Sequence, residues 1–387
     1  MIKRFSALIV SLVVFASCCF TARGLSVSAS SAVLMVADTG EVVFEKNAHQ
    51  RRGMASTTKI MTALLTAECA TPNRVVVTTP EMVNVEGTSM GLKVGDKVTF
   101  HDLIYGMLLA SGNDAANTAA IAIDGSISSF AARMNKRAAE IGMADTNFVT
   151  PSGLDDENHY STAYDMALLG CCALKNAVFS EACSTYSAEL CYGNEPYTRY
   201  ISNHNKLLKS FDGAVGIKTG FTKKSGRCLV SAATQNGVTL VCVTLNAPDD
   251  WNDHKKLLEY GFGQVNLKNF NVNLNELSVV GGSAPSVPLS LSSDLQVASA
   301  CDVSEFDIEV KLKSFEYAPI NKGDIVGRVI VKLDGETVAD SAIIADSSVE
   351  CITEEIPAKH SLFNRVKSFL KNLFSKIKGF FKERQAA

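Results

Sequence analysis

The chain has 387 residues, of which 47% are hydrophobic and 20% are charged. These values are ordinary for a globular protein and exclude a disordered chain, and the length allows one large domain and a smaller module. The net charge of −3 hides an uneven distribution. Residues 30–358 carry 26 basic and 39 acidic side chains, a net charge of −13, whereas residues 359–387 carry eight basic side chains and one acidic, a net charge of +7.

The first 29 residues have the pattern of a secretory signal. Two basic residues precede an apolar run over residues 5–20, and small residues follow. A transmembrane anchor is the alternative, but the apolar run is short for a bilayer span. Cleavage after Ala22 or Ala29 suits the small-residue rule, and a lipoprotein site at Cys18 is a weaker alternative. We therefore expect residues 1–29 to be a signal peptide and the protein to be exported.

Between residues 30 and 263 the pattern predicts one α+β domain. Strands at 31–37 and 41–46 flank Asp38-Thr39-Gly40, a hairpin signal. The other elements expected are helices at 113–123, 128–141 and 161–176, strands at 213–218, 227–235 and 238–246, the last two joined at Asn236-Gly237, and a helix at 252–262. Strands at both ends of a domain with helices between them favour a single antiparallel sheet covered by helices, with a site at their junction.

Ser56 opens the tetrapeptide S-T-T-K at the start of an expected helix, for which serine is a good N-cap. Lys59 lies three residues later, so both side chains share one face of that helix. A desolvated, neutral Lys59 amine could take the proton of the Ser56 hydroxyl and make it a nucleophile. The spacing alone is weak evidence, because two more S-x-x-K matches, at Ser368 and Ser375, occur in the tail.

Two further polar clusters strengthen this interpretation. S-G-N, from Ser111 to Asn113, lies between an apolar stretch and a helical one, a usual place for site residues. K-T-G, from Lys218 to Gly220, ends a strand-like segment at a glycine, where a backbone can approach a ligand closely. Taken alone, K-T-G would more often be a solvated strand end. The three clusters together predict an acyl-transfer enzyme.

The order S-x-x-K, S-x-N, K-T-G resembles that of the serine penicillin-binding proteins. The likeness is closer to the D-alanyl-D-alanine carboxypeptidases of low molecular mass, as in M-A-S-T-T-K-I-M-T-A-L around Ser56, L-L-A-S-G-N-D-A-A around Ser111 and G-I-K-T-G-F-T-K-K-S-G-R-C-L-V around Lys218. It covers residues 31–263 strongly and 269–355 more weakly, as the small β-domain of that family. The resemblance implies a penicillin-binding, β-lactamase-like fold for the first part.

The resemblance also implies roles for the matching residues. Ser56 would attack the carbonyl between two terminal D-alanines and form an acyl-enzyme, with Lys59 as its base. Ser111 and Lys218 would extend the proton path to the leaving amine, and Asn113 would hold a substrate amide.

Substrate binding would involve the strand that carries K-T-G. The backbone N–H groups of Ser56 and Phe221 would form the oxyanion hole. Thr219 and Lys218 would face the terminal carboxylate of the substrate, and Gly220 would allow the close approach of the strand.

One departure from the family concerns carboxylate recognition. Many relatives carry an arginine shortly before the last helix of the catalytic domain, and residues 250–253 hold none. Arg227 is a candidate substitute, and an ordinary exposed strand residue is the alternative. His159 and His204 are expected to be hydrogen-bonded structural histidines rather than catalysts.

The eleven cysteines do not predict a disulfide framework or a metal site. Cys18 and Cys19 would leave with the signal, and nine, an odd number, remain. No C-x-x-C occurs, and the one adjacent pair among the nine, Cys171-Cys172, lies in an apolar helical stretch where packing is expected. We expect no metal, no cofactor and no redox chemistry.

After residue 263 the sequence pattern changes from mixed helices and strands to short strands. Short alternating strands split by turns at 269–355 predict a small all-β module.

Over residues 359–387 apolar positions recur at helical spacing with basic residues on the remaining arc, a pattern typical of an amphipathic helix in an anionic membrane surface. The alternatives are a helix docked on its own protein and nucleic-acid binding, which export disfavours. Carboxypeptidases of the resembling group are similarly tethered, so we expect a location at the outer face of the cytoplasmic membrane.

The favoured function is a D-Ala-D-Ala carboxypeptidase that trims peptidoglycan stem peptides, with β-lactam antibiotics as covalent inhibitors. A DD-endopeptidase or a β-lactamase using the same site is an alternative, although the E-x-x-L-N element of class A β-lactamases is missing. A non-catalytic wall-binding protein is the third possibility. The intact Ser56, Lys59, Asn113 and Lys218 argue against it.

Overall fold

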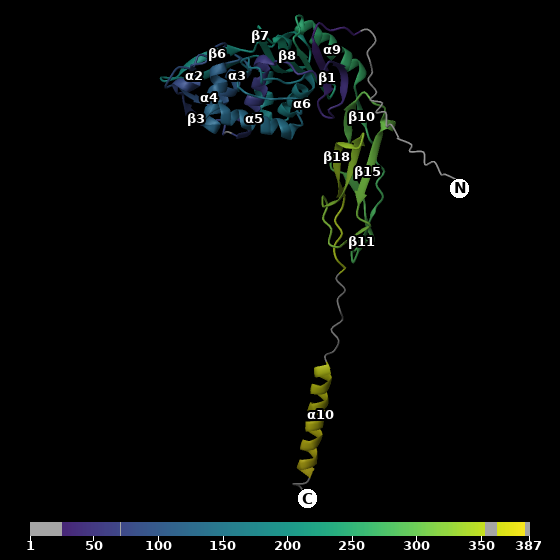
Figure 1. Ribbon diagram of the computed structural model, residues 1–387. Coiled ribbons are helices and arrows are strands. Elements are labelled where there is room, and N and C mark those ends of the chain that lie inside the picture. Colours follow the sequence, from purple (N-terminus) through teal and green to yellow (C-terminus); the bar gives the residue numbers. More distant parts are fainter. Residues whose placement is uncertain (1–24, 70, 353–361, 384–387) are drawn as a thin grey trace, which may run out of the picture. The chain divides into compact units, whose positions relative to one another are not determined.

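The computed structural model describes residues 25–69, 71–352 and 362–383 (Figure 1). Residues 1–24 of the expected signal peptide lie outside this part of the chain. The chain divides into two compact units. Unit 1 comprises the described residues up to Asn271 together with residues 294–308 and 331–339, and unit 2 comprises residues 272–293, 309–330 and the described residues from 340 onward.

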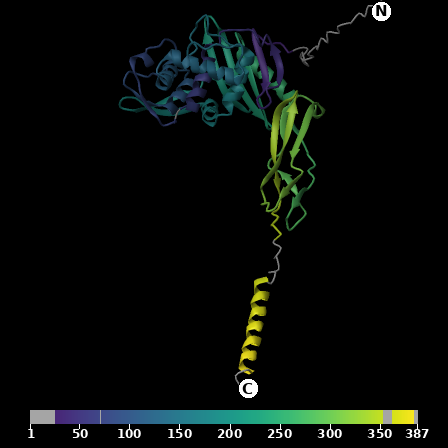
Figure 2. The same cartoon turned by 60° about the horizontal axis from the view of Figure 1, so that its bottom comes forward.

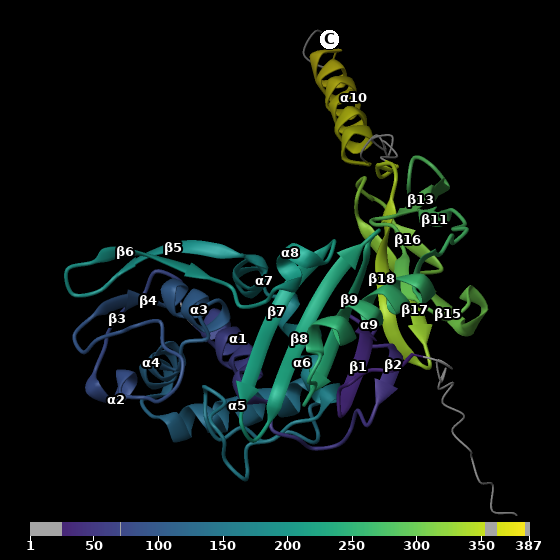
Figure 3. The same cartoon turned by 90° about the horizontal axis from the view of Figure 1, so that it is seen from above.

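Five antiparallel strands form the large sheet of unit 1, in the order β2-β1-β9-β8-β7 (Figure 3). They are β1 (Ser31–Val36), β2 (Val42–Lys46), β7 (Ala214–Thr222), β8 (Gly226–Gln235) and β9 (Val238–Leu245). Asn236 and Gly237 both have positive φ angles, 50° and 80°, as a two-residue hairpin turn requires. All five predicted strands are confirmed. Strand β7 is longer than predicted, because it continues past Lys218 to Thr222, so K-T-G lies inside an edge strand rather than at its end.

Both faces of this sheet are buried, because side chains alternate along each strand. Leu34 packs with Leu257 in a cluster under helix α9 (Asp250–Gln264). Val33 and Met35 point the other way, into the larger hydrophobic core shared with the other helices. Figures 1 and 2 show these helices, in blue, beside the sheet.

The helical part of unit 1 follows the local signals of the sequence. Its elements are η1 (Ala55–Thr58), α1 (Lys59–Cys69), α2 (Pro80–Val83), α3 (Phe100–Leu108), α4 (Asn113–Asp124), α5 (Ile127–Ile141), α6 (Ala163–Leu174), α7 (Ala177–Ser184) and α8 (Leu207–Ser210), with the hairpins β3 (Val75–Val77)/β4 (Lys97–Thr99) and β5 (Ser187–Tyr192)/β6 (Tyr197–Ser202). The helices predicted at 113–123, 128–141 and 252–262 are confirmed as α4, α5 and α9. The helix predicted at 161–176 is confirmed as α6, and α7, which was not predicted, follows it because Asn176 accepts a hydrogen bond from Phe179 N and caps a new helix.

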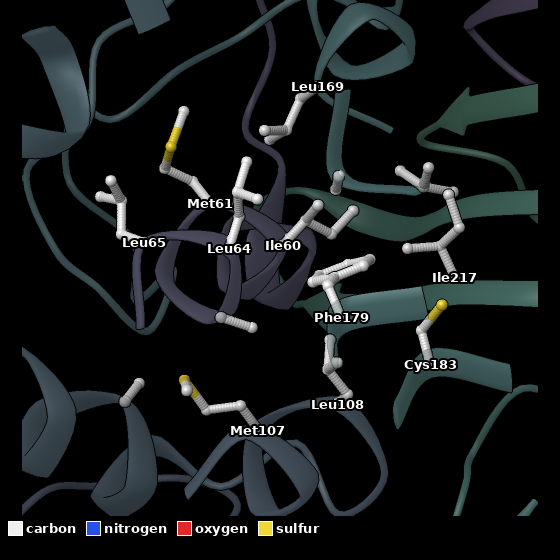
Figure 4. Close-up of a cluster of buried hydrophobic side chains, with 14 of the residues drawn as sticks. Ile60, Met61, Leu64, Leu65, Met107, Leu108, Leu169, Phe179, Cys183 and Ile217 are labelled. Atoms are coloured by element: carbon white, nitrogen blue, oxygen red, sulfur yellow. The ribbon is translucent and has the colours of Figure 1, made fainter. Parts of the chain in front are cut away.

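Helix α1 lies in the centre of the larger core. Ile60, Met61 and Leu64 are 0%, 0% and 1% exposed. Figure 4 shows these side chains among residues of other elements, including Phe179 of α7 and Ile217 of β7. This packing fixes the start of α1 beside strand β7, and it therefore places the S-T-T-K and K-T-G segments next to each other.

The segment just before β1 also belongs to unit 1. Val27 and Ala29 are buried in the cluster under α9. Asp253 of α9 accepts hydrogen bonds from the backbone N–H groups of Ser28 and Ala29, at 2.8 and 3.0 Å. The folded domain thus begins before the expected boundary at residue 30. Cleavage after Ala29 would remove these contacts, whereas cleavage after Ala22 would leave them intact.

The chain after α9 is built from strands up to residue 352, as predicted. The strands are β10 (Asn266–Asn269), β11 (Leu277–Val280), β12 (Ser286–Val287), β13 (Leu289–Leu291), β14 (Gln296–Ser299), β15 (Phe306–Leu312), β16 (Phe315–Tyr317), β17 (Ile325–Leu333) and β18 (Glu336–Ala345). They form sheets in the orders β10-β14, β12-β11-β16 and β13-β18-β17-β15, with one short 3₁₀ helix, η2 (Val303–Glu305). Helix α10 (Leu362–Glu383) follows.

Candidate active site

Ser56 lies in a tight helical turn immediately before α1. It is the second residue of η1, and Lys59 is the first residue of α1. The N-cap residue is Met54, which has no side-chain capping hydrogen bond. The prediction that Ser56 caps the helix is therefore wrong, because the 3₁₀ turn begins one residue earlier. The predicted meeting of the two side chains is confirmed, since Lys59 Nζ lies 2.9 Å from Ser56 Oγ.

The Lys59 amine is completely buried and has three partners. Nζ lies 2.7 Å from Asn113 Oδ1, 2.7 Å from the Ser152 carbonyl oxygen and 2.9 Å from Ser56 Oγ. Burial first, and the positive charge of Lys218 second, hold the pKa of this amine well below its ordinary value. A neutral amine has two N–H groups and one lone pair. When the N–H groups are donated to Asn113 and Ser152, the lone pair faces the Ser56 hydroxyl.

The S-G-N segment joins α3 to α4 and contacts Lys59 through Asn113. The Asn113 amide is used at both ends, because Oδ1 accepts from Lys59 and Nδ2 donates to the Glu86 carbonyl oxygen at 2.6 Å. Asn113 thus orients Lys59, and each end of its amide can form one further hydrogen bond, so its expected contact with a substrate amide stays a prediction. Ser111 has a φ of +60° and lines the same cleft as Ser56. Its hydroxyl forms no hydrogen bond with any residue that the structure describes.

The K-T-G segment brings the edge strand β7 against Ser56. A Cβ atom on Gly220 would lie 3.0 Å from the Met54 carbonyl oxygen and 3.1 Å from the Ser56 nitrogen, so a larger residue would push the two segments apart, and glycine favours this close approach. The Lys218 side chain is buried, and its amine donates to the Thr219 carbonyl oxygen at 2.9 Å. Burial lowers the pKa of Lys218 to about 7. This lysine can therefore change protonation state near neutral pH.

The N–H group of Phe221 is directed away from the sheet. Phe221 lies opposite Arg227 of β8 in the antiparallel register. The Arg227 carbonyl oxygen accepts from Ala247 N at 2.9 Å, so the backbone polar groups of Arg227 face away from β7. In an antiparallel pair the opposite residue then points its own N–H group outward, here to the open edge of the sheet. Phe221 and Ser56 line one cleft, which is the arrangement that a two-donor oxyanion hole requires.

The cleft has a volume of about 350 Å³ and contains a further basic group, Arg227. Arg227 Nη2 donates to Asp250 Oδ1 at 2.7 Å, and the guanidinium lies 5.9 Å from the centre of the Trp251 ring. The Arg227 side chain is 42% exposed, whereas that of Asp250 is 4% exposed. Arg227 is thus anchored on one side and open to the cleft on the other. The cleft also holds Thr219, as the sequence predicted.

Comparison with known proteins agrees with this geometry. The family model of D-alanyl-D-alanine carboxypeptidases matches residues 19–249, more than half of the chain. The chain belongs to the D-alanyl-D-alanine carboxypeptidase family. A second model, the C-terminal domain of penicillin-binding protein 5, matches residues 262–351.

Relatives of the carboxypeptidase family resemble this chain over most of its length. It is 33% identical to the D-alanyl-D-alanine carboxypeptidase DacF of Bacillus subtilis, over 84% of this chain and 87% of the relative. It is 32% identical to DacC of Escherichia coli, over 85% and 86%. Among solved structures, penicillin-binding protein 5 from Haemophilus influenzae covers 84% of this chain and 98% of its own, with a TM-score of 0.63 and 28% identity. The Streptomyces K15 DD-transpeptidase matches 62% of this chain and 98% of its own, with a TM-score of 0.59 and 31% identity.

The two histidines singled out in this carboxypeptidase differ in their surroundings. His159 is buried and hydrogen-bonded through both ring nitrogens, which confirms its expected structural character. The same expectation for His204 is wrong. Its exposed ring lines the cleft and makes no hydrogen bond within the described part of the chain. Burial, and then the charge of Lys218, lower the pKa of His204.

The sequence did not reveal the residues that hold the S-G-N segment in place. Asp114 is fully buried, and its carboxylate accepts hydrogen bonds from Ser89 Oγ and from the backbone N–H groups of Met90, Gly91 and Leu92, at 2.6 to 3.0 Å. A carboxylate so bonded fixes the loop before α3 against the start of α4. The only available signal was the aspartate that follows S-G-N, which a single sequence does not distinguish from a helix N-terminal charge.

Proposed function

We propose that this protein is a serine-type D-Ala-D-Ala carboxypeptidase that removes the terminal D-alanine from peptidoglycan stem peptides. The observation that carries the proposal is the buried Lys59 amine, which is held by Asn113 and Ser152 with its third partner the Ser56 hydroxyl. The names of the relatives agree with it. A lysine held in this way is a base at neutral pH, which an ordinary lysine is not.

Acylation begins when Ser56 Oγ attacks the carbonyl carbon between the two D-alanines and its proton passes to Lys59 Nζ. The negative charge on the carbonyl oxygen is stabilised by the N–H groups of Ser56 and Phe221. The C–N bond then breaks, and the leaving amine of D-alanine takes a proton. Ser111 and Lys218 supply the proton path, because Ser111 lines the cleft and the pKa of Lys218 is about 7. Water attacks the resulting ester and restores Ser56.

Thr219 and Arg227 bind the terminal carboxylate of the substrate in this proposal. Thr219 lies beside the nucleophile, and Arg227 faces the same cleft from the next strand. Asp250 neutralises part of the arginine charge but occupies only one side of the planar group. Arg227 Nε is buried, so the N–H groups at the end of the guanidinium are the ones that can donate to a carboxylate. Lys218 is buried behind Thr219, so we assign it to the proton path rather than to direct carboxylate binding.

β-Lactam antibiotics are expected to acylate the same serine, because their strained amide meets the same nucleophile and the same oxyanion hole. A DD-endopeptidase reaction is the second candidate, and it is favoured only by the openness of the cleft toward solvent on the side of Phe221, which is 65% exposed. A peptide that continues past the D-alanine could leave on that side. Neither a β-lactamase nor a non-catalytic binding role gains support from a feature of this site.

We infer that α10 tethers the enzyme to an anionic membrane. Its described apolar side chains are exposed by 44% to 66%: Val366, Phe369, Leu370, Leu373 and Phe374. Residues 359–387 carry a net charge of +7, which suits the outer face of an anionic bilayer. No single described helix has the length and hydropathy of a membrane span, and α6 and α7 meet that test only as a pair bent by 106°. Co-sedimentation with anionic and with neutral vesicles tests the tether, and equal binding to both would contradict it.

The enzymatic proposal is tested with the purified full-length protein and its Ser56→Ala variant. Each is incubated with a fluorescent penicillin and, separately, with a peptide ending in D-Ala-D-Ala. We expect the wild type to be labelled and to release D-alanine, and the variant to do neither. Labelling without release of D-alanine would leave the acyl-enzyme chemistry standing and overturn the assignment of substrate. A wild type that is not labelled would overturn the proposal itself.

A further inference from the structure

The backbone immediately before the nucleophile has an unusual conformation. Ala55 precedes Ser56, is 1% exposed, and has a φ of +49°. L-residues other than asparagine and aspartate seldom adopt this left-handed region, because Cβ approaches the following carbonyl oxygen. The direction of the Ser56 N–H group depends on the Ala55–Ser56 peptide plane. Contacts to Ala55 therefore determine where that N–H group points.

A chain of buried hydrogen bonds holds the Ala55 carbonyl group. Thr58 Oγ1 lies 2.8 Å from the Ala55 carbonyl oxygen and 2.8 Å from His159 Nε2. His159 Nδ1 accepts from Val149 N at 2.9 Å. Because Nδ1 accepts an N–H group, the neutral ring carries its proton on Nε2 and donates it to Thr58. The threonine hydroxyl is then left to donate to Ala55, so the direction of every bond is determined.

The imidazole is neutral under physiological conditions. Burial lowers the pKa of His159 to about 4, and the carboxylates of Asp156 and Asp155 act in the opposite direction. The Phe148 ring packs edge-on, with 6.0 Å between ring centres. A protonated ring would lose the bond from Val149, since both nitrogens would be donors.

The loop bonded to His159 also supplies the partner of the catalytic lysine. Val149 donates to His159, and three residues later the Ser152 carbonyl oxygen accepts from Lys59. The next residue, Gly153, packs directly on Ala55: a Cβ atom there would lie 2.0 Å from the Ala55 oxygen. The imidazole thus connects the backbone of the nucleophile with the loop that orients its base.

We propose that His159 is a positioning residue for acylation, acting through Thr58 on the Ser56 N–H group and through Val149 on the Ser152 carbonyl group. This inference rests on the proposed acyl-enzyme mechanism and adds a residue that touches neither the substrate nor the Ser56 hydroxyl. The consequence is that the rate of acylation depends on the His159–Thr58–Ala55 hydrogen bonds, while noncovalent binding in the cleft does not.

A matched pair of variants at Thr58 isolates these bonds. Thr58→Val keeps the shape and removes the hydroxyl, and Thr58→Ser keeps the hydroxyl and removes a methyl group. In the full-length protein, the rate of labelling is measured against the concentration of fluorescent penicillin, which separates the noncovalent dissociation constant from the first-order acylation rate. We expect the acylation rate to fall at least about 10-fold in Thr58→Val, with dissociation constants within about twofold and Thr58→Ser close to the wild type, because small misplacements of catalytic groups are costly.

Variants of His159 extend the test. The His159→Gln variant tests whether a side-chain amide N–H can replace the Nε2 N–H as the donor to Thr58. The His159→Leu variant removes the donor altogether. We expect partial recovery in His159→Gln relative to His159→Leu, and a parallel loss of affinity for a peptide boronic acid, whose tetrahedral adduct places an oxygen in the oxyanion hole. If His159→Leu does not fold, the Thr58 pair decides. A folded Thr58→Val protein that acylates within twofold of the wild type overturns this inference, whereas a wild type that is not labelled overturns the proposed function instead.

Discussion

The two walls of the cleft differ in burial and in hydrogen bonding. On the helical wall, Lys59 and Asn113 are 0% and 4% exposed, and both side chains are hydrogen-bonded to protein groups. On the sheet wall, Phe221 is 65% exposed and the Arg227 side chain 42% exposed, with one fixed partner. Desolvation tunes the chemistry on the first wall, whereas the groups on the second stay hydrated until a substrate replaces the water. We therefore expect residues of the helical wall to determine the rate of acylation and exposed residues of the sheet wall to determine substrate binding.

The largest effect is expected on the helical wall, at Lys59. A Lys59→Arg substitution keeps a positive charge and hydrogen-bond donors but cannot give a neutral base, because the guanidinium stays protonated. We expect the rate of penicillin acylation to fall about 10³-fold, in the middle of the range for loss of a general base. The rate is measured with fluorescent penicillin, and thermal unfolding shows whether the variant is folded. A folded variant that retains a tenth of the wild-type rate would refute the role of Lys59 as the base.

A smaller effect, on binding alone, is expected on the sheet wall at Arg227. A charged hydrogen bond contributes about 1.5–3 kcal/mol, so Arg227→Ala should raise KM by about 10- to 100-fold for a peptide with a free terminal carboxylate. The same peptide with a terminal amide has no charge to lose and should be affected little. Steady-state kinetics on both peptides provide the measurement, and Arg227→Lys serves as the charge-retaining control. Equal losses on the two peptides would show that Arg227 is only a structural partner of Asp250.

Lys218 belongs to strand β7 of the sheet wall but is buried, and we expect it to limit the rate at alkaline pH. Its pKa is about 7, so it loses its proton as the pH rises through neutrality. If protonated Lys218 supplies the proton that the leaving amine takes, release of D-alanine should fall about tenfold for each pH unit above this pKa. The reason is that the protonated fraction of Lys218 falls in that proportion. In Lys218→Arg the charge persists, and this decline should disappear even if the maximal rate is lower. A decline that persists unchanged in the variant would assign the alkaline limb to another group.

The sequence was sufficient for the sheet and most helices, because their signals are local. Alternating strands, the Asn236-Gly237 turn and capping residues such as Asn176 act within a few positions of the chain. Helix α7 was missed, although Asn176 marks its start. The N-terminal boundary was also missed, because the contacts between Asp253 and the segment before β1 join residues more than 200 positions apart.

The site was predictable only where short motifs mark it. Ser56, Lys59, Ser111 and Lys218 lie in such motifs, and the fold brings them to one cleft or its floor. The carbonyl group of Ser152 and the His159–Thr58 bonds have no sequence signal, since they depend on a backbone oxygen and on a loop that folds back. The different surroundings of His159 and His204 likewise follow from tertiary packing alone.

The smallest predicted effect is on the pH dependence of stability. It concerns a histidine far from both walls, on the face of the sheet under α9. His254 is fully buried between Ser231 Oγ at 2.6 Å and Thr244 Oγ1 at 2.9 Å, and burial lowers its pKa to about 3. The native state favours the neutral ring, whereas the unfolded chain binds a proton near pH 6.5, so stability is complete above pH 6.5 and declines as the pH falls toward 3. Between pH 7 and 5.5 this group alone should reduce the free energy of unfolding by about 1 kcal/mol.

Urea unfolding of the wild type and of His254→Gln at these two pH values measures that difference. The glutamine variant does not titrate, so its stability should depend less on pH by about the same 1 kcal/mol. His159 titrates in both proteins and cancels from the comparison. Because His254 lies behind the sheet, penicillin labelling of the folded variant should match the wild type at pH 7. A pH slope equal in both proteins would mean that the unfolded state also shields the ring, and an altered labelling rate would show that the sheet transmits the change to the cleft.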